Sequence, residues 1–387
     1  MKVGSRAINP EYRTEKQLGA SLSESRKIAW ISQALPTGPL HKNLQSHIAS
    51  VRYRTLIPAR ELQQRGIENV VISPEADARS TEELLSGSSA AVFGKLSLFD
   101  PQAVLESARK HLALAARAQS LGIRVIADVC EDRFDHELLG GYWKDMVRTA
   151  DRIVTSTTQL AELVRQAGAQ NVEIVPDPVE GHGDRPRFEP GSNMEAGSEK
   201  SHWGPPPLRI LWFGHQSNLD EMQEFLPELD RWVCARSRFV EFNVVTSAGF
   251  GAENMVLERR AAGSSLRVQH VVWTLGIAEV ALQNCDLVVI PATLQNSRKR
   301  SKSANRVTES LHAGRYVLAH PVPSYLEFAD YTWIGDDLLA GLDWALANPD
   351  SVVKQIKAGQ AFIRQTYLPA EIASRWEVAL DLATATI

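Results

Sequence analysis

The sequence contains few cysteines and no strong excess of charge of either sign. Its three cysteines, Cys130, Cys234 and Cys285, stand far apart, each in or beside an apolar stretch. This excludes a disulfide framework or a zinc knuckle and is typical of a reducing compartment. The formal net charge of −4 and an isoelectric point near 6.2 give no global field that attracts nucleic acid or an anionic membrane. We therefore expect no nucleic-acid partner.

Long apolar runs are also missing. The first 25 residues are polar and charged, without the apolar segment of a signal peptide. No stretch approaches the roughly 20 apolar residues that a membrane span requires. The sequence thus predicts a cytoplasmic protein with at most peripheral membrane contact. An apolar fraction of 44% and a length of 387 residues are typical of a globular chain with two domains of ordinary size.

Apolar segments that resemble strands alternate with helical patterns in two stretches of the chain. The first stretch begins at 27–32 and continues to about residue 175, and the second restarts at 208–213. Such alternation predicts an α/β fold with mostly parallel sheets and helices on both faces of each sheet. Between the two stretches, residues 181–207 are rich in Gly, Pro, Ser and charge, which is the composition of a linker.

We therefore predict two Rossmann-like domains that face a central cleft. The predicted divisions are a disordered lead-in at 1–25, an N-terminal Rossmann-like domain at 26–180, the linker at 181–207, a C-terminal Rossmann-like domain at 208–368, and a last helix within 369–387 that packs back on the N-terminal domain. Because ligands of open α/β sheets bind beyond the carboxyl ends of the strands, the loops after each strand would line the cleft.

The most informative segment is 290–319, where a buried strand is followed by a basic loop and a short helix. Ser303 and Asn305 are suitable N-cap residues for this helix, and Gly314 is suitable for its end. Free N–H groups, the positive end of the helix dipole and nearby basic side chains suit a pyrophosphate. Glu309, one turn further in, is placed to accept both hydroxyls of a ribose. The alternative is a solvated basic loop before a capped surface helix.

The run from Lys302 to Gly314, KSANRVTESLHAG, resembles the donor-site segment of GT-B glycosyltransferases. It is most similar to the retaining group called family 4, whose helix follows K-x-x-N-[KR]-x-x-E-x-x-x-x-G. Residues 50–62, 128–156 and 175–179 follow the usual order of segments in that group, so the resemblance spans roughly 27–380.

The resemblance implies a hexosyltransferase-type glycosyltransferase with the GT-B fold. Such an enzyme moves a sugar, with retention, from a nucleotide-sugar donor to a glycan, lipid-linked or small-molecule acceptor, and the group needs neither cofactor nor metal. By the same resemblance, Glu309 would bind the ribose, Asn305 would cap the helix under the diphosphate, and Lys302 and Arg306 would neutralise phosphate charge. The donor-binding residues predicted in this way are Gly214, His215, Ser217, Lys302, Ser303, Asn305, Arg306 and Glu309.

Gly214, His215 and Ser217 directly follow the apolar segment 208–213. The resemblance places the donor phosphates close to this turn, and a glycine allows the backbone to approach a ligand closely. The alternative is a plain turn between a strand and a helix.

Two groups of charged residues in the N-terminal half are candidates for the cleft. Arg52, Tyr53 and Arg54 lie where the first helix begins, and one arginine there would face donor phosphate or an acidic acceptor. The alternative is that both arginines face solvent. An acidic cluster after 124–129 would be an acceptor-binding loop that includes Asp132, an irregular metal site or a solvated loop. The predicted acceptor or cleft residues are Arg52, Tyr53, Arg54 and Asp132.

One departure from the family pattern concerns the transferred sugar. The group commonly carries a second glutamate eight positions before Glu309, and this sequence has Ser301 there. That serine favours a non-catalytic nucleotide-sugar-binding relative, and a GT-B epimerase is a further alternative. An oxidoreductase is disfavoured because no G-x-G-x-x-G follows 27–32 or 208–213, and a P-loop is equally absent from the sequence. No histidine is assigned as a catalytic base.

Overall fold

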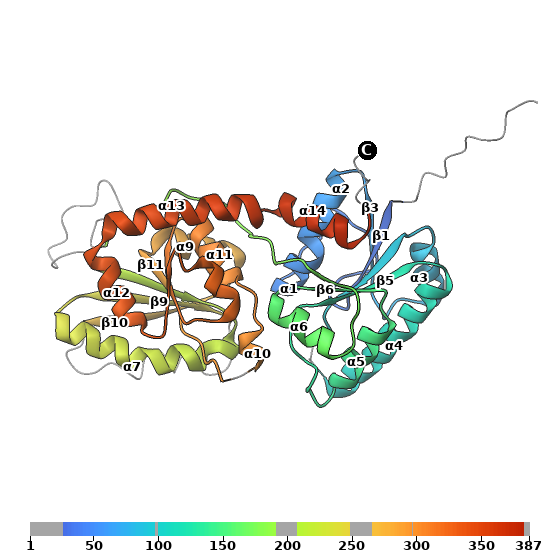
Figure 1. The fold of residues 1–387 in the computed structure, drawn as a ribbon, viewed down its shortest axis with the longest axis horizontal. Helices are drawn as coiled ribbons and strands as arrows, with labels where there is room; N and C mark the ends of the chain where they lie inside the picture. Colours follow the sequence, from blue (N-terminus) through green and yellow to red (C-terminus); the bar gives the residue numbers. More distant parts are fainter. Residues whose placement is uncertain (1–25, 97–99, 191–206, 248–264, 296, 383–387) are drawn as a thin grey trace, which may run out of the picture.

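The computed structural model describes residues 26–96, 100–190, 207–247, 265–295 and 297–382. These residues form two α/β domains that lie side by side, each built on one sheet with helices on both faces (Figure 1). The predicted fold class is therefore confirmed. The predictions for the lead-in 1–25 and for most of the linker 181–207 fall outside the described residues.

The N-terminal domain contains a sheet in the order β2-β3-β1-β4-β5-β6-β7. Its pairs are parallel except for β2 with β3. The strands are β1 (Lys27–Ile31), β2 (Gly38–Pro39), β3 (Glu68–Ile72), β4 (Ala90–Phe93), β5 (Arg124–Val129), β6 (Arg152–Thr155) and β7 (Val172–Ile174). The helices are α1 (Ala49–Val51), η1 (Arg52–Leu56), α2 (Ile57–Gln64), α3 (Ala78–Leu85), α4 (Pro101–Ser120), α5 (Gly140–Thr149) and α6 (Thr158–Gln166).

The C-terminal domain contains a parallel sheet in the order β10-β9-β8-β11-β12-β13. The strands are β8 (Leu208–Phe213), β9 (Val240–Thr246), β10 (Leu266–Val272), β11 (Leu287–Ile290), β12 (Tyr316–Ala319) and β13 (Trp333–Ile334). The helices are η2 (Gln216–Asn218), α7 (Leu219–Arg236), α9 (Leu275–Asn284), α10 (Ser297–Arg300), α11 (Asn305–His312), η3 (Pro323–Phe328), α12 (Leu338–Ala347), α13 (Pro349–Thr366) and α14 (Pro369–Ala379).

Local sequence signals explain where many of these elements begin and end. Asp100 accepts a hydrogen bond from the N–H of Ala103 at the start of α4, and Thr157 does the same for Leu160 at the start of α6. After α11, Gly314 has a φ of 74° and lies so close to Arg185 that an added Cβ would be 2.3 Å from its carbonyl oxygen. Only glycine meets both requirements without strain.

The central strands of each sheet are buried and largely apolar, because helices cover both faces of the sheet. In β1, Ala29 and Ile31 pack into one core of the N-terminal domain, while Ile28 and Trp30 pack into the core on the opposite face. The strands of the C-terminal domain divide their side chains between two cores in the same way. This arrangement is typical of parallel sheets and fixes the loops after each strand as the positions open to ligands.

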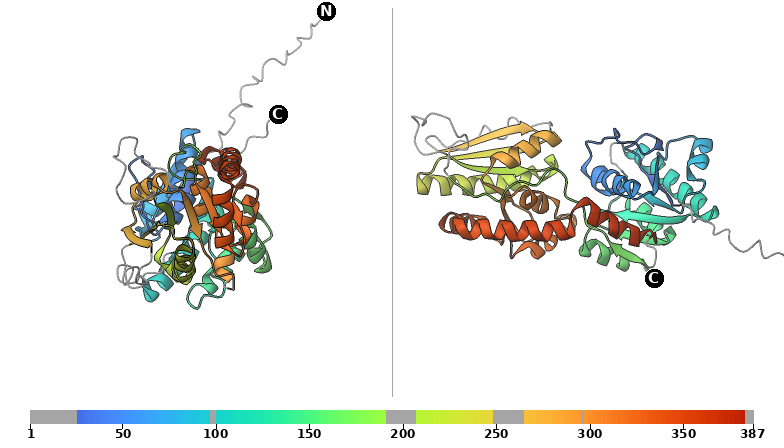
Figure 2. Two further views of the ribbon diagram at one scale, coloured as in Figure 1. Left: turned by 90° about the vertical axis from the view of Figure 1, so that its left-hand side faces the viewer. Right: turned by 90° about the horizontal axis from the view of Figure 1, so that it is seen from above.

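The last helix of the chain belongs to the core of the first domain. In Figure 2, α13 lies on the C-terminal domain and leads directly into α14 on the N-terminal domain. Ile372 and Trp376 of α14 are fully buried among residues of β1 and α2, and the Trp376 ring centroid lies 5.2 Å from that of Trp30. The chain thus passes between the domains twice, near 176–178 and near 368–369.

The helix after β1 differs from a regular α-helix. Residues Arg52–Leu56 form a π-helical turn, η1, between α1 and α2, and all five residues are buried. π-helical turns are uncommon and occur frequently at functional sites. The sequence predicted one regular helix here and missed this turn, and α3, α5 and α9 were also not predicted.

Candidate donor site between the domains

The loops that follow the strands of both sheets contact each other. Thr157, after β6, donates its hydroxyl hydrogen to the carbonyl of Ser301 at 3.2 Å, and Ser303, after β11, donates to Asp177 at 2.6 Å. Tyr53, after β1, donates to Glu309 on α11. The candidate site residues from the two halves of the chain are therefore neighbours in the fold.

At the end of β8, the backbone of Gly214 lies close to the positively charged guanidinium of Arg306. An added Cβ on Gly214 would lie 3.4 Å from Nη1 of Arg306, so a side chain at this position would press on the guanidinium. Arg306 is only 9% exposed, and its Nη1 has no hydrogen-bond partner among the described residues. A buried guanidinium nitrogen without a partner is costly, which indicates a position suited to an anionic ligand.

Two lysines of the basic loop reinforce this positive charge. Lys302 contacts the side-chain oxygen of Asn218, and Lys299 lies 3.1 Å from the same oxygen and 2.8 Å from Glu221. Burial, with the nearby charges of Arg306 and Lys299, lowers the pKa of Lys302 to about 7. Arg306, Lys299 and Lys302 together carry more positive charge than the carboxylate of Glu221 balances. A bound diphosphate would neutralise this excess.

His215 and Ser217 form the turn that starts η2. The Nδ1 atom of His215 lies 3.2 Å from the backbone nitrogen of Ser217 and accepts its hydrogen, so His215 caps this short helix. Burial and the charge of Lys95 from the other domain lower the pKa of His215. The turn is thus both a local cap and a position between basic residues of the two domains.

The helix cap predicted for Asn305 is wrong. Ala304 occupies the N-cap position of α11 and makes no side-chain cap, while Asn305 is the first helical residue. The Asn305 side-chain oxygen accepts from the N–H of Arg306 at 2.9 Å, so it still satisfies one free donor of the first turn. Ser303 lies one residue too early to cap the helix, and its hydroxyl contacts Asp177 instead.

Glu309 is the carboxylate of this site, and Tyr53 covers it. The Tyr53 hydroxyl donates to the Oε1 atom of Glu309, and Tyr53 itself is 5% exposed. Burial raises the pKa of Glu309 to about 7, although the hydrogen bond from Tyr53 opposes this shift. Burial and the neighbouring Glu309 charge raise the pKa of Tyr53 well above its usual value. The hydroxyl therefore remains a hydrogen-bond donor throughout the neutral range.

Arg52 covers a tryptophan of the C-terminal domain. Its guanidinium carbon lies 5.2 Å from the ring centroid of Trp273, which follows β10, and its Nε is 2.8 Å from a carboxylate oxygen of Glu180. Arg52 is held between an aromatic ring and a carboxylate beside the Tyr53–Glu309 contact. The prediction that one arginine of this helix faces donor phosphate or an acidic acceptor stays a prediction.

Arg54 has a different environment from the one predicted. It is 3% exposed and bonds Asp128 at 2.7 Å, Asp177 at 3.2 Å and the carbonyl of Val175. These partners raise its pKa, against the opposing effect of burial. Because its guanidinium is committed to these buried partners, we assign Arg54 to the scaffold that holds the crossing near 177, not to a ligand.

The acidic residues after β5 do not form one cluster. Asp128 pairs with Arg54, and Glu131 pairs with Lys95 and with Arg133, which is 2.9 Å away. Asp132 is 7% exposed and accepts from the N–H of Phe134 at 3.4 Å within its own loop, and its predicted contact with an acceptor stays a prediction. Among the described residues, no group of three or more His, Cys, Asp or Glu is arranged to hold a metal ion.

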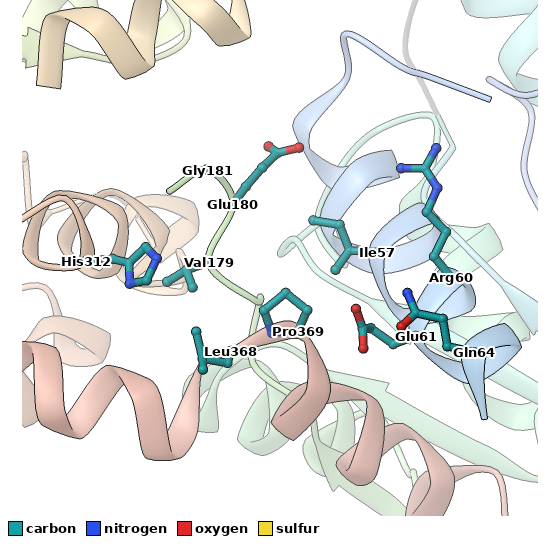
Figure 3. Close-up of a pocket in the computed structure, with 10 residues that line it drawn as sticks. All are labelled: Ile57, Arg60, Glu61, Gln64, Val179, Glu180, Gly181, His312, Leu368 and Pro369. Atoms are coloured by element: carbon teal, nitrogen blue, oxygen red, sulfur yellow. The ribbon is translucent and has the colours of Figure 1, made fainter. Parts of the chain in front are cut away.

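A hollow of about 280 Å³ lies on the hinge side of the same interface (Figure 3). Ile57 and Arg60 of α2 line it on one side, His312 of α11 lines it on the other, and Glu180 lies on the crossing segment between them. Ile57 is one turn beyond Tyr53, and His312 is one turn beyond Glu309. The two helices that carry the Tyr53–Glu309 contact are therefore separated by open space further along.

Several contributors to the site were not found from the sequence. Trp273, Asn218, Glu180 and Thr157 carry no motif, and Asp177, in the segment 175–179, was not assigned to the site; the fold places all five in the loops after strands or on a crossing segment. Their position directly after apolar strand segments was the one available signal. No described helix of the chain is both long and apolar enough to span a membrane.

Comparison with known proteins gives a clear result for the fold alone. No protein-family model matches the sequence, and no curated protein matches it. Among solved structures, the chain is similar to Anabaena HepE in complex with UDP-glucose, with a TM-score of 0.57 and 12% identity over 92% of this chain and 100% of that one. It is also similar to an α-glucosyltransferase in complex with UDP-glucose and DNA, with a TM-score of 0.61 and 10% identity over 92% and 99% of the two chains.

A third similar structure is TarM, with a TM-score of 0.55 and 12% identity over 78% of this chain. The match spans 57% of the TarM chain, so TarM is considerably longer. HepE and the α-glucosyltransferase are matched over nearly their full length. Together with the two-sheet architecture, these similarities show that the chain has the GT-B fold of glycosyltransferases.

Proposed function

We propose that the protein is a glycosyltransferase that uses a nucleotide sugar as donor. The observation that carries this proposal is the arrangement at the start of α11. The Arg306 Nη1 atom is buried without a partner among the described residues, Lys302 and Lys299 add charge beside it, and Glu309 lies one turn further along the helix. This spacing suits the diphosphate and the ribose of one nucleotide.

The site's chemistry suits departure of a diphosphate. In the proposed reaction the bond between the sugar's anomeric carbon and the diphosphate oxygen breaks, and a bond from that carbon to an acceptor hydroxyl oxygen forms. The proton of the acceptor hydroxyl passes to the departing phosphate. Cations already in place at the leaving oxygen stabilise the charge that develops there, which is the largest contribution a site of this kind makes. We propose a glycan, lipid-linked or small-molecule acceptor, retention at the anomeric carbon and no metal requirement.

Binding is the first experiment. Two of the similar structures hold UDP-glucose, which makes UDP-sugars the first donors to test by calorimetry and thermal shift, with GDP- and ADP-sugars beside them. We expect Glu309→Ala and Arg306→Met to weaken binding of the preferred nucleotide at least tenfold. Lys357→Met, at an exposed position of α13, is the matched control and should leave the affinity unchanged. Unaltered affinity in both site variants would refute the donor site.

Turnover separates the proposed enzyme from a binding protein. Ser301 favours the non-catalytic alternative, because its hydroxyl contacts the carbonyl of Arg298 and the described contacts place no carboxylate at this position. Release of nucleoside diphosphate that depends on acceptor supports the transferase. Tight nucleotide binding without release, across glycan, lipid and small-molecule acceptors, supports the binding protein.

A further inference from the structure

Tyr53 and a bound ribose would require the same atom. Tyr53 of the N-terminal domain donates its hydroxyl hydrogen to Oε1 of Glu309 in the C-terminal domain. A ribose that donates both of its hydroxyls to this carboxylate needs Oε1 and Oε2 together. The same hydrogen bond places the Tyr53 hydroxyl directly beside the carboxylate, where it takes one of the acceptor positions of Oε1. Tyr53 therefore competes with a ribose for this side of Glu309.

We propose that Tyr53 is an autoinhibitory plug, which holds the ribose position on Glu309 in the empty protein and leaves it when the nucleotide binds. This inference rests on the proposed function, since it takes Glu309 as the ribose-binding residue. It adds that nucleotide affinity is reduced by the contact between the domains, and that donor binding moves the helix η1 away from α11.

The π-helical turn explains how the plug is positioned. Three successive residues of η1 reach three different partners: Arg52 contacts Glu180 and Trp273, Tyr53 contacts Glu309, and Arg54 contacts Asp128 and Asp177. All five residues of η1 are buried, so the turn is enclosed by its partners on every side, and π-helical turns of this kind occur frequently at functional sites.

The interface around the plug is suited to exchange. The contacts across it include the hydrogen bonds from Thr157 to Ser301 and from Ser303 to Asp177, and the stacking of Arg52 on Trp273. Next to them, the hollow of about 280 Å³ replaces close packing between α2 and α11. Separation of the two helices therefore breaks a few polar contacts and exposes little tightly packed apolar surface.

The test measures the dissociation constant of UDP, or of the nucleotide that the panel selects, for wild type and Tyr53→Phe. Phenylalanine keeps the ring but cannot bond Glu309, so we expect binding about tenfold to a hundredfold tighter, the effect of removing one hydrogen bond to a carboxylate. The matched control is Tyr367→Phe, which removes a buried hydroxyl that donates to Glu327 at 2.7 Å and should not change the affinity.

The results of this experiment test the Tyr53 plug and the proposed donor site separately. Unchanged or weaker binding by Tyr53→Phe overturns the plug, while Glu309→Gln still reports on the ribose site. If wild type binds no nucleotide, or if Glu309→Gln binds as wild type does, the proposed function falls and the plug falls with it.

A second measurement needs no variant. Nucleotide binding should speed amide hydrogen exchange in residues 52–57 of wild type, because η1 loses the contact of Tyr53 with Glu309 on α11. Slower exchange there contradicts the displacement of Tyr53.

Discussion

At the scale of single residues, two groups of the candidate site titrate close to neutrality and in opposite senses. Burial lowers the pKa of Lys302 to about 7 and raises that of Glu309 to about 7. A diphosphate binds better when Lys302 is protonated, and a ribose binds better when Glu309 is ionised. Both conditions hold together only in a narrow range around neutral pH.

The affinity for a nucleotide sugar should therefore be bell-shaped in pH with its maximum near pH 7. Above this pH Lys302 loses its proton before the ligand arrives, and below it Glu309 gains one. The donor itself does not ionise near neutral pH, so calorimetry from pH 5.5 to 8.5 isolates the protein groups. In Lys302→Arg the affinity should no longer fall above pH 7 but should still fall below it. In Glu309→Gln the affinity should no longer fall below pH 7 but should still fall above it. A flat wild-type profile would contradict these assignments.

Ionised Glu309 should also destabilise the folded protein when no ligand is bound. Its folded-state pKa of about 7 lies above the model value of 4.5 for the unfolded chain. Between these values the unfolded chain binds fewer protons, so stability falls as pH rises, and the cost is complete above pH 7. At pH 8 the unfolding free energy of Glu309→Gln should exceed that of wild type by on the order of 1–3 kcal/mol. Near pH 4.5 the two proteins should be equally stable. Urea unfolding at both pH values measures this difference.

Sequence reasoning selected Lys302 and Glu309, before and on α11, as candidates and missed the residues that contact them. Lys302 and Glu309 are recognisable because a basic loop, a helix start and a carboxylate one turn later are local along the chain. The contact of Tyr53 with Glu309 joins residues 256 positions apart and depends on how two domains meet. Arg54 was assigned to the cleft because it lies where the first helix begins, and its actual partners, Asp128 and Asp177, are 74 and 123 positions away in sequence.

At the scale of elements, helix ends were predicted well where glycine dictates them, and the π-helical turn was missed. Gly314 has a positive φ directly after α11, the helix that the sequence predicted to end there, and Gly66 and Gly122 have a positive φ after α2 and α4. The winding of η1 follows no residue pattern, because it is set by the buried partners that Arg52, Tyr53 and Arg54 reach. Local chemistry thus determines where an element stops, and tertiary contacts determine such irregularities within it.

Gly122 and Gly314 form a matched pair that separates backbone strain from close packing. Both have a φ of 74°, but an added Cβ meets open space at Gly122 and lies 2.3 Å from the Arg185 carbonyl oxygen at Gly314. Gly122→Ala should cost about 1 kcal/mol of unfolding free energy, from positive φ alone. Gly314→Ala should cost at least about 2 kcal/mol more because backbone must move. Equal losses in chemical denaturation would show that the Arg185 contact is unimportant.

At the scale of the whole molecule, α14 fastens the two domains together. It continues from α13 of the C-terminal domain and completes the core of the N-terminal domain around Trp30 and α2. Of the two crossings, the one near 177 is held by Arg54, which also lies 5.4 Å from the ring of Trp376. The interface that would bind the donor is thus anchored at one side and joined by sparse polar contacts at the other.

Removal of the Trp376 side chain should destabilise the protein strongly. Trp376 is fully buried, so Trp376→Ala should lower the unfolding free energy by about 3–5 kcal/mol. Val378→Ala on the same helix, where the side chain is 53% exposed, should stay within about 0.5 kcal/mol. Thermal and urea unfolding of both variants, followed by circular dichroism, test this. Comparable losses would mean that α14 does not form part of that core.

The position of α14 also has a consequence for how the protein is made. Residues 372–380 complete a core whose first strand, β1, begins at residue 27. A ribosome that adds about 5–20 residues per second exposes β1 to solvent for tens of seconds before its last neighbour emerges. During that interval the surface around Trp30 is uncovered, and a nascent chain stalled before residue 369 should bind holdase chaperones through it. The first domain to be synthesised is therefore the last to be finished.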